Sequence, residues 1–165
     1  MKYGLIILTF LCCFSIASSA QLKYGIRKAN AFFTEWTPGT IRANDNGDPE
    51  FQGPDTINTI YIETTGGPIK WISAWKDGKS FSVTTTIIHD RPVEVGVNRA
   101  NNAKVTLRPQ KGNQLWLLQL EKKGTSSKPP VRAKKGEIIL QGKYGGKLFI
   151  KKITSQIGLE SLPSV

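Results

Sequence analysis

Stretches of alternating apolar and polar residues recur along most of the chain, with the two-residue period that is typical of β-strands. They cover residues 56–63, 69–76, 79–88, 93–97, 103–107, 115–121, 137–140 and 147–153. Gly, Pro, Asn and Asp separate these stretches, and no long helical period is visible. Eight short strands with this punctuation predict an all-β fold. We expect an antiparallel β-sandwich, Ig-like or jelly-roll-like, with a small β-barrel as the alternative.

Asp77-Gly78 separates two of the expected strands and is a strong signal for a two-residue hairpin turn. A turn there pairs Trp75 with Ser80, and regular alternation puts Trp71 on the same face as Trp75, about 13 Å away. Serine and threonine residues surround both indoles on that face. Indole rings beside hydroxyl groups can stack on sugar rings, so Trp71 and Trp75 are candidate glycan-binding residues. The alternative is that another segment, such as residues 32–36, covers this face and buries both indoles.

Residues 1–20 have a different pattern. Lys2 supplies a positive charge, an apolar stretch runs from Leu5 to Ile16, and small residues end the segment before Gln21. This order is typical of a secretory signal peptide. The apolar stretch is shorter than the ~20 residues that cross a bilayer, and no later stretch is apolar enough to be a transmembrane segment. We expect residues 1–20 to be removed and residues 21–165 to form a single secreted or periplasmic β-sandwich domain, with a basic loop at residues 122–136.

Cysteine and glycosylation patterns bear on the cellular compartment. Cys12 and Cys13 both lie in the expected signal peptide, so the mature chain has no cysteine. It also has no Asn-x-Ser/Thr acceptor for N-glycosylation. Small secreted eukaryotic domains commonly carry disulfides. The two absences therefore favour a bacterial envelope protein that is stabilised by packing alone.

Positive charge is concentrated in the C-terminal half of the chain. Residues 21–98 hold 8 Lys or Arg and 9 Asp or Glu, whereas residues 99–165 hold 14 Lys or Arg and 3 acids, a net charge of +11. Such asymmetry indicates a charged face that meets an anionic partner. Six cations lie between residues 122 and 136, where there is no acid: Lys122, Lys123, Lys128, Arg132, Lys134 and Lys135. Because Gly, Ser and Pro surround them, we expect a mobile surface loop.

These six side chains are candidates for binding an anionic surface or polysaccharide through salt-sensitive contacts. The alternative is a protective role, because lysine-rich loops and edges keep β-proteins from pairing edge to edge. There is no aromatic RNA-binding motif and no zinc-finger spacing, so specific nucleic-acid recognition is not expected. The sequence is also compatible with a protein as the binding partner.

Enzymatic chemistry has few residues at its disposal. His89 is the only histidine, and the chain lacks a usual set of zinc ligands, so we expect no cofactor and no metal centre. The acidic loop at residues 45–55 carries Asp45, Asp48, Glu50 and Asp55. These carboxylates could form a weak calcium-binding loop or catalyse glycoside hydrolysis. A solvated acidic loop without either function is the favoured interpretation.

The few candidate catalytic residues and the basic C-terminal half favour a non-enzymatic binding or interaction module of the cell envelope or extracellular space. Such a module would meet an anionic partner through its basic half. The first alternative is a glycan-binding domain that uses Trp71 and Trp75. The second is a small carboxylate-dependent glycan-cleaving enzyme. A β-fold of this kind hosts many roles, so the choice depends on how the candidate side chains are arranged.

Overall fold

The computed structural model describes residues 25–36, 42–43, 45–47, 49–50, 55–67, 69–88, 91–123 and 127–160. The expected signal peptide, His89 and much of the acidic loop lie outside these ranges. All regular structure within them is β, which confirms the all-β class. This part of the chain contains no helix that is long and apolar enough to cross a membrane.

The described residues form twelve strands. These are β1 (Ile26–Trp36), β2 (Arg42–Ala43), β3 (Pro49–Glu50), β4 (Asp55–Thr64), β5 (Ile69–Lys76), β6 (Lys79–Ile88), β7 (Val93–Asn98), β8 (Ala103–Leu107), β9 (Gln114–Lys122), β10 (Ile138–Tyr144), β11 (Lys147–Ile153) and β12 (Gln156–Leu159). Each of the eight strands expected from alternation is present, as β4 to β11. Alternation did not predict β1, β12 or the two-residue strands β2 and β3.

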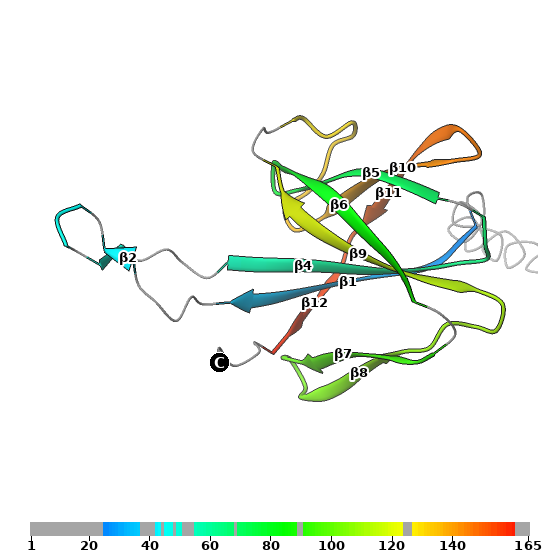
Figure 1. The fold of residues 1–165 in the computed structure, drawn as a ribbon, viewed down its shortest axis with the longest axis horizontal. Helices are drawn as coiled ribbons and strands as arrows, with labels where there is room; N and C mark the ends of the chain where they lie inside the picture. The colour runs from blue at the N-terminus through cyan, green and yellow to red at the C-terminus, as the bar shows by residue number, and fades with distance from the viewer. Residues whose placement is uncertain are drawn as a thin grey trace, which may run out of the picture.

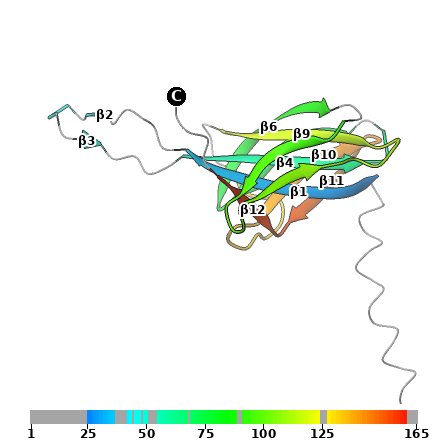
Figure 2. The same ribbon diagram turned by 90° about the horizontal axis from the view of Figure 1, so that it is seen from below.

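Ten of the strands form one continuous sheet in the order β11-β10-β5-β6-β9-β4-β1-β12-β7-β8, and β2 pairs with β3 separately. Neighbouring strands of the large sheet are antiparallel except β1 and β12, which are parallel. The sequence predicted two stacked antiparallel sheets. The structure instead has a single mixed sheet that curls like half of a barrel (Figures 1 and 2).

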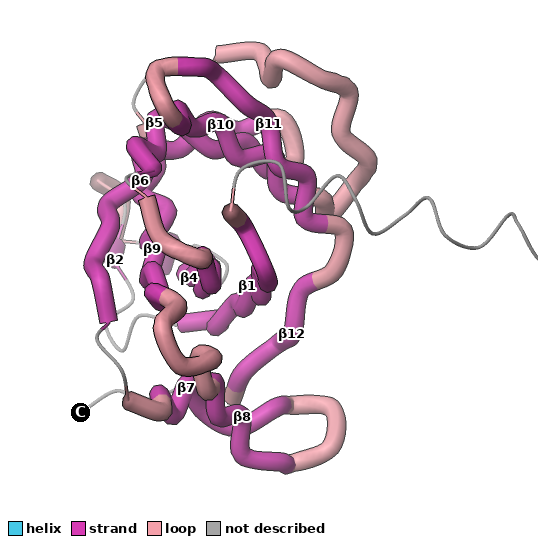
Figure 3. The backbone as a smooth tube through the Cα atoms, turned by 90° about the vertical axis from the view of Figure 1, so that its right-hand side faces the viewer, coloured by secondary structure: helices cyan, strands magenta, loops and turns pink. Residues whose placement is uncertain are grey.

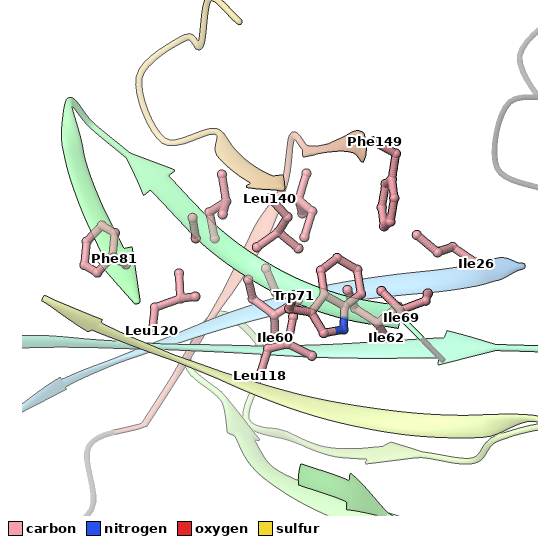
Figure 4. Close-up of a cluster of buried hydrophobic side chains, with 14 residues drawn as sticks. Ile26, Ile60, Ile62, Ile69, Trp71, Phe81, Leu118, Leu120, Leu140 and Phe149 are labelled. Atoms are coloured by element: carbon pink, nitrogen blue, oxygen red, sulfur yellow. The ribbon is translucent and has the colours of Figure 1, made fainter. Parts of the chain in front are cut away.

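The two ends of the sheet curl towards opposite faces of the central strands (Figure 3). On one face, here called the concave face, β5, β10 and β11 enclose the larger hydrophobic cluster (Figure 4). On the other face, β12 and the β7–β8 hairpin cover a smaller cluster around Phe32 and Tyr61. Neighbouring residues of a strand point to opposite faces, so Ile60 joins the larger cluster and Tyr61 the smaller one. The central strands are therefore buried on both sides.

The predicted hairpin turn is present. Asp77 and Gly78 have φ angles of 49° and 76°, as in a type I′ turn, and Lys76 pairs with Lys79. The pairing of β5 with β6 reaches only as far as Ala74, and β6 continues alongside β9. β5 and β6 therefore separate beyond Ala74, whereas the other edge of β5 stays paired with β10 from Lys76 to Ile69.

A β-bulge in β5 interrupts the regular alternation of its side chains. Ser73 pairs with Gln141 whereas Trp71 pairs with Gly142, so Ile72 is an extra residue without a partner on β10. An extra residue reverses the face on which the following side chains lie. The bulge therefore turns Trp71 towards the concave face.

Candidate functional site

The two candidate indoles lie on opposite faces of β5, and both are buried. Trp71 is 7% exposed and Trp75 is 6% exposed. Trp71 belongs to the concave cluster, where its ring meets the ring of Phe149 edge to face with centroids 5.7 Å apart. Neither indole offers an open face to a sugar, so the prediction of a glycan-binding platform at Trp71 and Trp75 is wrong. The bulge at Ile72 is one reason, because the prediction assumed regular alternation.

The second reason is that residues of the predicted basic loop, here called the basic segment (residues 122–136), cover Trp75. The indole N–H of Trp75 donates to the backbone carbonyl of Ser127 at 3.0 Å and lies 3.1 Å from its hydroxyl oxygen. The backbone N–H of Ser127 donates to Oγ of Ser80, the cross-strand partner of Trp75, at 3.3 Å. The alternative interpretation, in which another segment buries the indoles, gave residues 32–36 as an example of such a segment, and at Trp75 the covering residue is Ser127.

Other hydrogen bonds hold both ends of the basic segment against the sheet. Lys123 Nζ donates to Ser73 Oγ at 3.2 Å, and the backbone N–H of Gly136 donates to Asp77 Oδ1 at 2.7 Å. The composition of the segment predicted a mobile loop, whereas its described residues are anchored at both ends and over Trp75. Composition alone misses this anchoring because the partners are single polar residues on distant strands.

Glu137 adds a further anchor just after the basic segment. Its buried carboxylate accepts the backbone N–H of Lys134 at 2.7 Å and forms an ion pair with Lys152 at 3.0 Å. Lys152 Nζ also donates to the carbonyl of Arg132 at 3.0 Å. The bond from the Lys134 N–H, followed by the bond from Lys152, lowers the pKa of the Glu137 carboxyl. The carboxylate therefore stays charged at neutral pH and ties the segment to β10 and β11.

The six cations predicted to bind an anionic partner are all exposed: Lys122, Lys123, Lys128, Arg132, Lys134 and Lys135. They come from the end of β9 and from the connection that runs over β5 and β10 (Figure 1). Because this connection is anchored, its exposed cations are carried on a backbone that is fixed against the sheet.

A cavity of 190 Å³ lies beside the β5–β6 turn. It is lined by Thr56 and Asn58 of β4, Lys76 of β5, Lys79 and Phe81 of β6 and Lys122 of β9. Asp77 is the one acid among the described residues that line it. In Figure 4, Phe81 and Leu120 lie at one end of the concave cluster and Phe149 at the other. The cavity therefore continues the concave face past its Phe81 end.

The strand register explains why three lysines converge on this cavity. Lys76 pairs with Ile138 on one side and with Lys79 on the other, and Lys122 pairs with Phe81. Directly paired residues of antiparallel strands point to the same face. Since Ile138 and Phe81 both belong to the concave cluster, the three lysines project from the concave face at its polar end.

Lys76 reaches across the concave face to the opposite strands. Its Nζ donates to Asn58 Oδ1 at 2.7 Å and to Gln156 Oε1 at 3.0 Å, and it lies 5.6 Å from the centroid of the Phe33 ring. Burial lowers the pKa of the Lys76 ammonium, and the charge of Asp77 opposes this shift. Both acceptors are neutral amides, so they solvate the ammonium without neutralising it.

Sequence reasoning missed this cavity as a site. The only local signal was the pairing of Lys76 with Lys79 across the Asp77-Gly78 turn. Nothing in the sequence near Asn58 or Gln156 indicated that they contact Lys76, because only the curl of the sheet brings β4 and β12 to the end of β5.

Within the described ranges, no three His, Cys, Asp or Glu side chains are grouped to hold a metal ion. No protein-family model, curated protein or solved structure matches this chain. The geometry and charge of the site are therefore what indicate a function.

Proposed function

We propose that the chain is an exported, non-enzymatic binding module that holds an anionic polymer or surface against its basic C-terminal half. The anchored basic segment carries this proposal, because its six exposed cations lie on a backbone that hydrogen bonds tie to the sheet. Binding to a fixed array of charges loses less conformational entropy than binding to a mobile loop does.

The distribution of charge supports a partner with many anionic groups. Residues 99–165 hold 14 Lys or Arg against 3 acids. Exposed charges are screened within roughly 8 Å at physiological salt, so each contact is weak and several must act together. An acidic polysaccharide, a teichoic acid or a lipopolysaccharide surface supplies such a repeated array. The signal-peptide pattern of residues 1–20 supports a location where these polymers occur.

The test is retention on an immobilised heparin column under a salt gradient. Reversing two exposed cations, Lys134→Glu with Lys135→Glu, should make the protein elute at lower salt than the unaltered protein. The slope of log affinity against log salt concentration should fall in magnitude by about 2, because each lost cation contributes about one unit. The melting temperature should stay nearly constant, since both side chains are exposed.

A matched control makes the same change of charge elsewhere. Arg27→Glu with Lys28→Glu alters two adjacent exposed residues of β1, outside the basic C-terminal half, and should shift elution much less. Retention that ignores salt, or equal shifts in the two double variants, would contradict the proposal. The basic segment would then have only a solubilising role.

A further inference from the structure

Three lysine side chains from three strands share one small cavity. Lys76, Lys79 and Lys122 line it, and Asp77 is the one acid among its described lining residues. Asp77 already accepts the backbone N–H of Gly136 through Oδ1. Lys79 and Lys122 are exposed and Lys76 is half-buried, and the repulsion between like charges is strongest where water is partly excluded, as it is around Lys76. The cavity therefore holds an excess of positive charge, which an anion would neutralise.

Lys76 is placed to donate to such an anion. An ammonium has three N–H donors, and two of those of Lys76 go to the amide oxygens of Asn58 and Gln156. Hydrogen bonds to the backbone carbonyls of Thr56 and Gly136 fix the orientation of these two amides. Within the part of the chain that the structure describes, no carboxylate forms an ion pair with Lys76, so one of its donors remains for a ligand.

We propose that this cavity binds one oxyanion group (phosphate, sulfate or carboxylate) of the anionic partner, with Lys76 as the central donor and Lys79 and Lys122 beside it. The inference rests on the proposed function, because it takes the partner to be anionic. The volume of 190 Å³ lies below the roughly 300–1,000 Å³ of pockets that enclose drug-sized ligands. The cavity therefore suits a single charged group rather than a whole sugar or nucleotide.

The cavity is continuous with the basic segment. Gly136, at the end of the segment, donates its N–H to Asp77 at the cavity rim and accepts the side-chain N–H of Gln156 through its carbonyl. Gln156 in turn accepts from Lys76. Lys122 belongs both to the segment and to the cavity lining. A polymer that follows the basic segment from the face that carries Trp75 to its end at Gly136 would therefore reach the cavity at the β5–β6 turn and could insert one charged group into it.

Isothermal titration calorimetry with inorganic phosphate, at constant ionic strength and neutral pH, tests the cavity directly. The full mature protein should show saturable binding at one site. Lys76→Met keeps most of the apolar stem but removes the charged donor, and should weaken binding about tenfold or more. Lys79→Gln alters an exposed side chain and should weaken binding about two- to fivefold. The double reversal at Lys134 and Lys135 should leave phosphate affinity nearly unchanged, because both lie outside the cavity.

Absence of saturable phosphate binding, or equal affinity in the unaltered protein and in folded Lys76→Met, overturns the inference. If Lys76→Met does not fold, the phosphate affinity of Lys79→Gln is the test, and an affinity equal to that of the unaltered protein overturns the inference. These results are distinguishable from failure of the proposed function, which would appear as heparin retention that ignores the double reversal.

A competition experiment separates the two sources of the oxyanion. Phosphate that replaces chloride at equal ionic strength should elute the protein from heparin earlier if a polymer group occupies the cavity. Unchanged elution together with saturable phosphate binding would assign the cavity to a free oxyanion, and would overturn the part of the inference that concerns the polymer.

Discussion

Gly142 lies where two aromatic rings approach the backbone of β10. A Cβ atom at this position would lie 2.8 Å from Phe149 Cζ and 3.3 Å from Trp71 Cε3. Both rings belong to the concave cluster and are held by the residues around them. Glycine is needed at this position because the two side chains approach the backbone too closely for a Cβ atom. Gly142 also lies beside the bulge that turns Trp71 inward.

We therefore expect Gly142→Ala to destabilise the protein by about 1–3 kcal/mol, because the added methyl group forces two packed rings to move. The free energy of unfolding in urea measures this loss. In a Phe149→Leu background the nearest ring atoms are absent, so the same substitution should cost clearly less. Equal costs in the two backgrounds would show that the clash with Phe149 is not the cause.

At the scale of elements, the described residues of the basic segment after Lys122 have no regular structure and take their positions from the strands beneath them. Ser127 covers Trp75, Gly136 binds Asp77, and Glu137 accepts from Lys134. Together these contacts keep a highly charged segment on the sheet. The lowered pKa of Glu137 reflects the same anchoring, because its carboxylate is stabilised by the segment's N–H and by Lys152.

The anchoring predicts a dependence on pH. A carboxyl whose pKa is lowered in the folded state stabilises the fold above its ordinary pKa, and this contribution disappears as the pH falls through the lowered value. Glu137→Gln should therefore lower the melting temperature at neutral pH, and the difference should close in acid. Trypsin should also cut faster after Arg132, Lys134 or Lys135, as followed by mass spectrometry. The exposed carboxylate of Glu160 offers a control, and Glu160→Gln should change neither quantity appreciably. A difference for Glu137→Gln that persists unchanged in acid would indicate a steric cause.

At the scale of the whole molecule, a single sheet provides two separate packing faces. The concave cluster lies on one face of the central strands, and the β7–β8 hairpin covers the other. The cavity and the basic segment both lie towards the β5–β6 turn, where Asp77 joins them. The charged features therefore occupy one region of the protein, as binding to a single polyanion requires.

Export is the remaining prediction at this scale. The pattern of residues 1–20 predicts that the secreted or periplasmic product begins near Gln21, with or without cyclisation of that residue to pyroglutamate. Intact-protein mass spectrometry of the released product measures its first residue. Ala20→Leu removes the small residue before the expected cleavage point and should leave a longer product. Retention of Met1 in the released protein, or a membrane pellet that resists salt extraction, would contradict the prediction.

Local patterns in the sequence determined the eight strands β4 to β11, the hairpin turn at Asp77-Gly78 and the exposure of the six cations in residues 122–136. These features depend on a two-residue period, on the backbone freedom of a turn and on composition, all of which act between near neighbours. The sequence did not reveal β1, because its alternation is irregular, or β2, β3 and β12, because they have only two to four residues.

Only the tertiary structure decided that the strands form one curled sheet, that a bulge separates Trp71 from Trp75, and that three lysines share a cavity. Each of these outcomes depends on contacts between residues far apart in the chain. Trp75 binds a residue 52 positions away, and Lys76 binds one 80 positions away. Such contacts form because burial of the concave cluster brings distant strands together, and no local period of the sequence carries that information.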